Sequence, residues 1–199
     1  MYLRNFGISI LTAILLTISS FSYADETCMS PYMQKIVGQE DYVYVWTLGV
    51  EGLGDEQDKL VTIDVSPKSK TYGKVVSVLS VGGRNEAHHS GLSDDRHYLW
   101  AGGLDSNKIF IFDVATNPRK PSLSKVVIDF VEKTGGIVGP HTFYALPGRM
   151  MVSGLSNNKD NGGRTGLAEY NSKGEFIATH WLPTDGDLKG ANKTGNFAD

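Results

Sequence analysis

The residues best suited to chemistry in this sequence are three of its five histidines. His88 and His89 are adjacent, and His141 follows His89 by 52 residues. His89 lies nine residues before Tyr98 and His141 lies nine residues before Met150, and both of those residues stand near the start of an apolar run. This spacing predicts that the two histidine segments are equivalent loops of adjacent repeats. If these loops lead into the innermost strands, the three imidazoles converge on one point.

Converging neutral imidazoles are suitable ligands for copper, zinc, iron or nickel. Adjacent residues of a regular strand point to opposite sides, so His88 and His89 can both bind one metal only from a bent segment, which Gly91 would permit. Alternatively, one of them binds the metal while the other orients it or binds substrate. Glu86 either accepts a ring N–H from this group or is a solvated carboxylate. Hydrogen-bonded structural histidines without a metal also fit the pattern.

Other chemistries have little support in the sequence. His97 begins an apolar run after a polar turn and His180 stands beside Trp181, so both are interpreted as structural. Cys28 is the only cysteine, which excludes a disulfide within the chain and leaves a cysteine–histidine nucleophile without specific support. Residues 54–58 (GDEQD) are a solvated loop or, less simply, a calcium site. The sequence has no Gly-x-Ser-x-Gly elbow, phosphate-binding loop or His-Glu-x-x-His motif.

The elements that would position the histidines are short β-rich runs separated by Gly, Asn, Asp and Pro. Such runs alternate in polarity or are continuously apolar over the length of a strand, which predicts an all-β fold. They cover residues 42–48, 59–65, 74–81, 97–101, 108–114, 125–131, 149–153, 166–170 and 175–182.

These runs repeat as a group. The runs KLVTIDV and KIFIFDV carry Asp64 and Asp113 at equivalent places, 49 residues apart, and GLAEYN ends at Asn171 as a third copy. The preceding run has copies at residues 97–103 and 149–155. A period near 50 residues with three or four strands in each repeat predicts the blades of a β-propeller.

Propellers close with about 4–8 blades, and at this spacing residues 25–199 supply about three. We therefore expect an incomplete propeller, the N-terminal part of a longer one, forming a single domain over residues 25–199. A complete small β-sandwich is the alternative. Residues 157–164 (NNKDNGGR) are predicted to form a long exposed hairpin loop between two strands of one blade.

Residues 1–24 are predicted to be a secretory signal peptide. One positive charge at Arg4 is followed by the apolar residues 6–18 and by small residues at the −3 and −1 positions of a cut before Asp25. An uncleaved anchor is the alternative, although the apolar run is shorter than the roughly 20 residues of a spanning helix. We expect the mature chain to fold in a bacterial periplasm.

The charge of the chain argues against two classes of partner. There are 19 basic and 22 acidic residues, a net charge of −3, whereas a nucleic-acid groove needs a basic face. No run of like charges indicates binding to an anionic membrane, and no later segment is long and apolar enough to span one. We expect neither nucleic acid nor membrane as a partner of the mature form.

Four segments resemble the selenium-binding protein family: residues 41–67, 86–91 (EAHHSG), 109–123 and 139–147 (GPHTFYALP). The paired histidines with the later Pro-His-Thr make this resemblance specific. The N-terminal segment and residues 27–57 are most similar to the secreted bacterial branch, the methanethiol oxidases. The resemblance implies a seven-bladed propeller and a copper-dependent periplasmic oxidase that converts methanethiol, O2 and water into formaldehyde, hydrogen sulfide and hydrogen peroxide.

The resemblance also implies a ligand set for copper. His88, His89 and His141 match three of the family's ligands, and a fourth histidine near the C-terminus of full-length members has no counterpart in this chain. Animal members carry a cysteine just after the paired histidines, but residues 90–95 here are SGLSDD, so selenium binding by that route is not implied.

Three functions remain open from the sequence. The first is the oxidase, whose partners are a small volatile thiol and O2, with Trp46, Phe143 or Tyr144 either lining the thiol pocket or packing in the core. The second is a non-enzymatic propeller that binds selenium, a thiol or a metal. The third is an interaction propeller without a metal.

Overall fold

The computed structural model describes residues 30–157 and 163–183, and in these residues the chain forms three antiparallel sheets and one short helix. The first sheet contains β1 (Tyr42–Thr47), β2 (Lys59–Asp64) and β3 (Val75–Ser80). The second contains β4 (Ala87–Leu92), β5 (Tyr98–Gly103), β6 (Lys108–Asp113) and β7 (Ser122–Val127). The third contains β8 (Val138–Leu146), β9 (Arg149–Ser156), β10 (Gly166–Asn171) and β11 (Phe176–Trp181), and α1 (Phe130–Thr134) precedes it.

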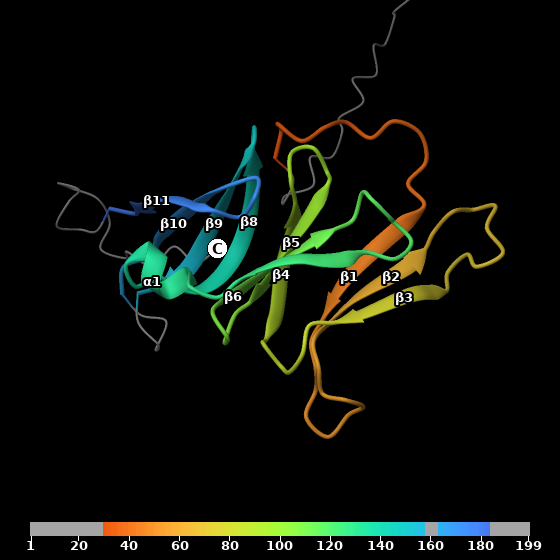
Figure 1. The fold of residues 1–199 in the computed structure, drawn as a ribbon, viewed down its shortest axis with the longest axis horizontal. Helices are drawn as coiled ribbons and strands as arrows, with labels where there is room; N and C mark the ends of the chain where they lie inside the picture. The colour runs from red at the N-terminus through yellow and green to blue at the C-terminus, as the bar shows by residue number, and fades with distance from the viewer. Residues whose placement is uncertain (1–29, 158–162, 184–199) are drawn as a thin grey trace, which may run out of the picture.

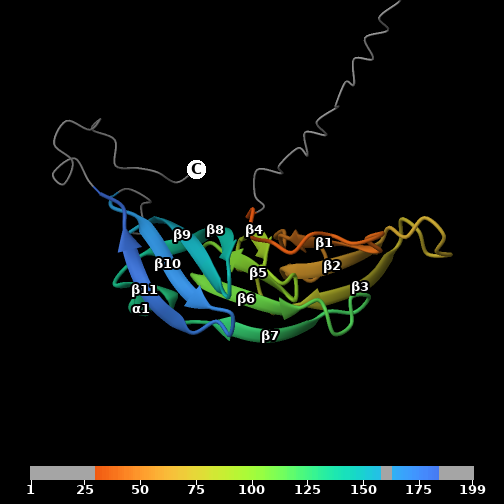
Figure 2. The ribbon, with the colours of Figure 1, turned by 90° about the horizontal axis from the view of Figure 1, so that it is seen from above.

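Each sheet is a meander in which consecutive strands pair, and the sheets follow one another in chain order (Figure 1). Figure 2 shows the three sheets side by side in an arc, with β1, β4 and β8 along one edge and β3, β7 and β11 along the other. The sheets touch along this edge, since β4 of the second sheet contacts both β1 of the first and β8 of the third. This is the arrangement of successive blades around a propeller axis, so the all-β prediction of about three blades is confirmed.

The turn between the last two strands of each sheet explains the sequence repeat. Asp64 at the end of β2 accepts hydrogen bonds from the Ser69 and Thr71 hydroxyls, and Asp113 at the end of β6 accepts them from the backbone N–H groups that follow it. Asn171 at the end of β10 accepts the N–H groups of Lys173 and Glu175. Because one polar side chain closes the same turn in every blade, it recurs at the blade period.

The core lies between the blades and depends on the middle strands. β6 has four consecutive buried residues because both of its faces are covered, whereas β2 in the first sheet alternates. Phe112 packs between the first and second sheets, and Trp100 and Phe143 pack in the cluster that joins the second and third. Trp46 donates its indole N–H to the Gly102 carbonyl at 2.9 Å. Trp46 and Phe143 are therefore packing residues, and Tyr144 is 40% exposed.

One predicted strand is wrong in part. Residues 125–131 were expected to be a strand, but β7 ends at Val127 and the apolar residues beyond it enter α1. Phe130 is fully buried there, and the Thr134 hydroxyl donates to the Phe130 carbonyl at 2.8 Å. Gly135, with φ near +76°, then ends the helix in the left-handed conformation that glycine adopts most readily.

Several sequence predictions fall outside the described residues. These are the signal peptide over residues 1–24, Cys28, and most of the hairpin loop predicted over residues 157–164. Within the part of the chain that the structure describes, no helix is long and apolar enough to cross a membrane.

Candidate metal centre

The three candidate histidines lie on the inner strands of two adjacent blades. His88 and His89 are in β4 and His141 is in β8, and these strands contact each other. The sequence prediction of two loops is wrong, because both segments pair along their length with the next strand of their own blade. The polar residues of β4 and the irregular pairing of both strands hide the alternation that marks the other strands.

A β-bulge in each strand puts the histidines on the shared side. In β4, Ala87 pairs with Gly103 and Ser90 pairs with Ala101, so two histidines oppose one residue of β5. β8 has the same irregularity between Pro140 and Phe143, across His141 and Thr142. An extra residue in a strand breaks the strict alternation of side chains. The bulge therefore meets the requirement for a bent segment that His88 and His89 impose.

Gly91 serves a different purpose from the bend that was predicted for it. A Cβ atom at Gly91 would lie 2.8 Å from the Phe143 Cβ and 2.9 Å from the Phe143 carbonyl oxygen. A Cβ atom at Gly102 of β5 would lie 2.5 Å from the Pro140 carbonyl oxygen. Both glycines thus let the second blade approach the backbone of β8 closely enough for the histidines to meet.

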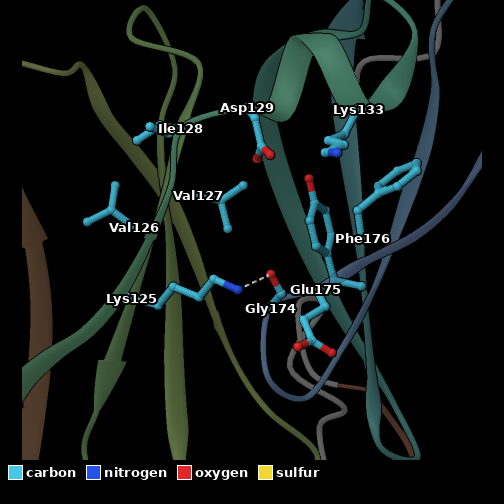
Figure 3. Close-up of a pocket in the computed structure, with 10 residues that line it drawn as sticks. Lys125, Val126, Val127, Ile128, Asp129, Lys133, Gly174, Glu175 and Phe176 are labelled. Atoms are coloured by element: carbon cyan, nitrogen blue, oxygen red, sulfur yellow. Dashed lines mark hydrogen bonds between the residues drawn. The ribbon is translucent and has the colours of Figure 1, made fainter.

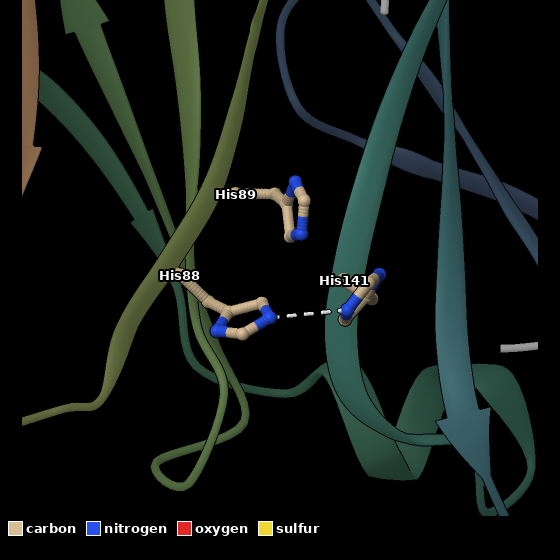
Figure 4. Close-up of side chains that lie close together, drawn as sticks. All are labelled: His88, His89 and His141. Carbon is tan, nitrogen blue, oxygen red and sulfur yellow. Dashed lines mark hydrogen bonds between the residues drawn. The ribbon is translucent and has the colours of Figure 1, made fainter. Parts of the chain in front are cut away.

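The imidazoles converge in the space between β4 and β8 (Figure 4). The Nε2 atoms of His88 and His141 are 3.1 Å apart, and the His89 ring centroid is 4.6 Å from that of His88 and 4.4 Å from that of His141. His141 is buried, while His88 and His89 are accessible to solvent. The Nδ1 atom of His141 lies 3.0 Å from the Thr142 hydroxyl, which orients the ring with Nε2 toward the other histidines.

This donor set fits a transition-metal ion. One ring nitrogen from each histidine can be chosen so that all three lie within 4.8 Å of one another. Imidazole nitrogens bind zinc at about 2.0–2.1 Å, so two nitrogens on such an ion are at most about 4.2 Å apart. The 3.1 Å separation of His88 and His141 meets this limit, and a shift of under about 1 Å brings the complete set within it. Three protein ligands also leave a coordination position for another group.

The other candidate residues lie elsewhere. Glu86 forms an ion pair with Arg84 at 2.6 Å. His97 packs on the Tyr98 ring and lies 3.5 Å from the Asp113 carboxylate. None of these side chains belongs to the histidine cluster.

His180 also has a partner on the outer strands of the third blade. Its Nε2 atom lies 2.7 Å from the Glu169 carboxylate, which also binds Arg149. The hydrogen bond with His180 is the main reason that the pKa of Glu169 lies below its usual value, and Arg149 adds to the effect. This carboxylate therefore holds strands together and is separate from the cluster.

The acidic loop at residues 54–58 uses its carboxylates locally. Asp55 pairs with Lys59, and Glu56 accepts the backbone N–H of Gly52. Asp58 is fully buried, a position that the interpretation as a solvated loop missed. Its carboxylate accepts backbone N–H groups of Gly49 and Asn85, so the carboxylates of this loop stabilise the local backbone conformation.

A cavity of about 430 Å³ lies between the outer strand of the second blade, α1 and the β10–β11 turn (Figure 3). Asp129 and Lys133 stand on its helical side, and Lys125 donates from the opposite wall to the Gly174 carbonyl at 2.7 Å. Tyr170 also lines it, and burial raises the pKa of its phenol. None of the three converging histidines lines this cavity.

Comparison with known proteins identifies the family to which the chain belongs. Residues 23–191 match the profile of the family described as "56kDa selenium binding protein (SBP56)". The chain is 59% identical over 193 residues to a methanethiol oxidase of Ruegeria pomeroyi and 60% identical over 167 residues to one of Hyphomicrobium sp. These alignments cover 97% and 83% of this chain but 44% and 38% of the relatives, so the chain spans less than half the length of either.

More distant relatives share the same region. The chain is 36% identical over 159 residues to selenium-binding protein 2 of Arabidopsis thaliana, covering 69% of this chain and 32% of the relative. The solved structure of a hypothetical selenium-binding protein from Sulfolobus tokodaii superposes with a TM-score of 0.64 at 28% identity. That superposition covers 75% of this chain and 38% of the other.

Proposed function

Because the chain belongs to the selenium-binding protein family, we propose that it is the part of a methanethiol oxidase that supplies three histidine ligands to a copper ion. The observation that carries this proposal is the convergence of His88, His89 and His141 from two adjacent blades. The names of the two bacterial relatives at 59% and 60% identity support the reaction. Further blades, and a fourth ligand, would come from a longer propeller.

The reaction is the conversion of methanethiol, O2 and water into formaldehyde, hydrogen sulfide and hydrogen peroxide. Bound copper would supply the one-electron chemistry with O2 and would lower the pKa of a coordinating thiol. The chain's own residues hold the site: Thr142 orients the His141 ring, and the two bulges direct the other imidazoles toward it. The thiol and O2 would approach from the side where His88 and His89 are accessible.

We propose a periplasmic location for this enzyme. The pattern of residues 1–24, with one basic residue, an apolar run and a cut before Asp25, supports export. Mass spectrometry of the N-terminus of the protein purified from the periplasm tests this, and we expect the chain to begin at Asp25. A chain recovered from the cytoplasm with Met1 in place would contradict it.

The direct test of the copper assignment compares three variants of the full-length protein. We expect His89→Ala and His141→Ala to lose bound copper and, with it, peroxide and sulfide formation from methanethiol. His180→Ala is the matched control, because it removes an imidazole from the third blade outside the cluster, and it should retain both. Copper bound in equal amounts by the parent protein and His141→Ala would contradict the assignment.

A second function is a propeller that binds selenium or a thiol without turnover, favoured by the similarity to the selenium-binding proteins of Arabidopsis thaliana. An oxygen-consumption assay with methanethiol separates the two functions. An oxidase consumes O2 when methanethiol is added, whereas a carrier binds the thiol and releases no peroxide.

A further inference from the structure

The residue that directly precedes the next-to-last strand of a sheet is hydrogen-bonded to the chain at the entry to the next sheet. Asp58 precedes Lys59, the first residue of β2, and Asn107 precedes Lys108, the first residue of β6. β2 and β6 are equivalent strands, so Asp58 and Asn107 occupy equivalent positions in the first and second blades. Each contact leads to one of the two histidine strands.

Asp58 is fully buried and ties three segments together. Its Oδ1 atom accepts the Gly49 N–H at 2.7 Å, and its Oδ2 atom accepts the Asn85 N–H at 2.8 Å. Its backbone pairs with Gly83 and Val81, at 3.0 and 3.2 Å. A buried carboxylate needs several hydrogen-bond donors to offset its loss of water, and these N–H groups provide them. Asp58 therefore fixes the backbone of Asn85.

The segment that Asp58 holds leads directly into the first bulge. Asn85 is itself buried and stands three residues before His88. The Asn85 amide donates to the Gly82 and Gly83 carbonyls at 3.1 and 3.2 Å, which closes the turn on the other side. The direction in which β4 starts is thus set by the first blade, although the histidines belong to the second.

Asn107 makes the corresponding contact one blade later. Its Oδ1 atom accepts the Gly139 N–H at 2.7 Å, and Gly139 stands two residues before His141. Asn107 has φ near +54°, a left-handed conformation that asparagine tolerates better than most residues. Only one acceptor atom is used here, so an amide is sufficient, whereas Asp58 uses both of its oxygens.

We propose that Asp58 and Asn107 are positioning residues for the metal centre: each anchors the start of a histidine strand from the blade before it, so that the two bulges face each other. This inference rests on the proposed function, since it concerns the same cluster. Loss of a residue that orients metal ligands typically lowers metal affinity about 10–100-fold. The anchors should therefore affect copper binding without touching the ion.

The test measures Cu²⁺ affinity and the electron paramagnetic resonance spectrum of the bound Cu²⁺ in the full-length protein after metal removal. We expect Asp58→Asn, which replaces one acceptor oxygen with a donor, to lower the affinity about 10–100-fold and to change the spectrum. Asp64→Asn is the matched control, because Asp64 stands at the other end of β2 and its side chain is hydrogen-bonded to the following turn and Arg119 and not to β4 or β8. It should keep both the affinity and the spectrum of the parent protein.

Two variants of Asn107 distinguish a loss of the hydrogen bond to β8 from a general loss of stability. Asn107→Gly removes the acceptor and still accommodates a positive φ, so it should weaken Cu²⁺ binding, whereas Asn107→Asp keeps the acceptor and should restore it. Parent-like affinity and spectrum in both Asp58→Asn and Asn107→Gly would overturn this inference and leave the proposed function standing. A parent protein that binds no Cu²⁺ would overturn both.

Discussion

The inner strands β4 and β8 differ from the middle strands of the same blades. β6 is regular and apolar, with four consecutive buried residues, whereas β4 is polar, bulged and accessible at His88. The middle strands pack blade against blade, and the inner strands present side chains toward the neighbouring blade. The comparison teaches that strands at different positions of one blade have different roles: the middle strands form the core, and the inner strands carry the candidate metal ligands. The bulge is the local change that lets an inner strand direct its histidines toward a common point.

The largest effect on stability is expected in a middle strand. Phe112→Ala leaves a cavity between the first and second sheets, where Phe112 is fully buried, and should lower the free energy of unfolding by about 3–5 kcal/mol. Urea unfolding of the full-length protein measures this. The folded fraction should keep its Cu²⁺. A loss of copper from the folded variant would contradict the view that the middle strands contribute packing and not metal binding.

A smaller effect on the free energy of unfolding, with a larger effect on Cu²⁺ affinity, is expected at the contact between the inner strands β4 and β8. Gly91→Ala places a Cβ atom 2.8 Å from that of Phe143, so β4 and β8 must move apart. Overpacking of this kind costs about 1–3 kcal/mol. We expect Cu²⁺ affinity to fall as well, while the adjacent Ser90→Ala, at an exposed position, leaves it unchanged. Unchanged binding in Gly91→Ala would show that this close approach is unnecessary.

The docking of the first sheet on the second should respond to alkaline pH. The Tyr44 hydroxyl donates to the Pro118 carbonyl at 2.9 Å, and burial raises the pKa of Tyr44 to about 12. A raised pKa means that this contribution is complete below about pH 10 and is lost as the pH rises through the folded-state value. Tyr44→Phe should cost about 1 kcal/mol at neutral pH. In unfolding experiments, the difference from the parent protein should disappear toward pH 12.

The smallest effect is expected at a turn that closes a blade. Hydrogen bonds from Thr116, chiefly from its backbone N–H, hold the pKa of Asp113 below its usual value. A lowered pKa means that this stabilisation is present above the usual carboxyl pKa and is lost as the pH falls through the folded-state value. Asp113→Asn should therefore weaken the acid dependence of the urea midpoint. The turn itself should persist, because an asparagine, Asn171, closes the equivalent turn in the third blade. An unchanged acid dependence would contradict this role.

Much of the fold could be predicted because the repeat arises from local features of the sequence, the apolar strands and the turns that connect them. Apolar runs and the turn residues Asp64, Asp113 and Asn171 mark the blades, and their period gives the propeller. The strands β4 and β8 were missed because their polar residues and bulges remove the alternation on which strand prediction depends. The helix over Phe130–Thr134 was missed because a short apolar run fits either element.

The site could be predicted in outline for a similar reason. The 52-residue interval between His89 and His141 is close to the blade period, and residues at equivalent places in adjacent blades meet near the axis. The anchors were not predicted, because Asp58 lies in an acidic run that resembles a solvated loop. The repeat could have indicated the anchors, because Asp58 and Asn107 directly precede the lysines that begin two matching strands.

The most direct test of the central claim is anomalous X-ray diffraction at the copper absorption edge from crystals of the full-length protein loaded with Cu²⁺. We predict one anomalous peak between β4 and β8, at bonding distance from ring nitrogens of His88, His89 and His141. A copper peak elsewhere in the molecule, with the three imidazoles bonded only to each other and to water, would contradict the account.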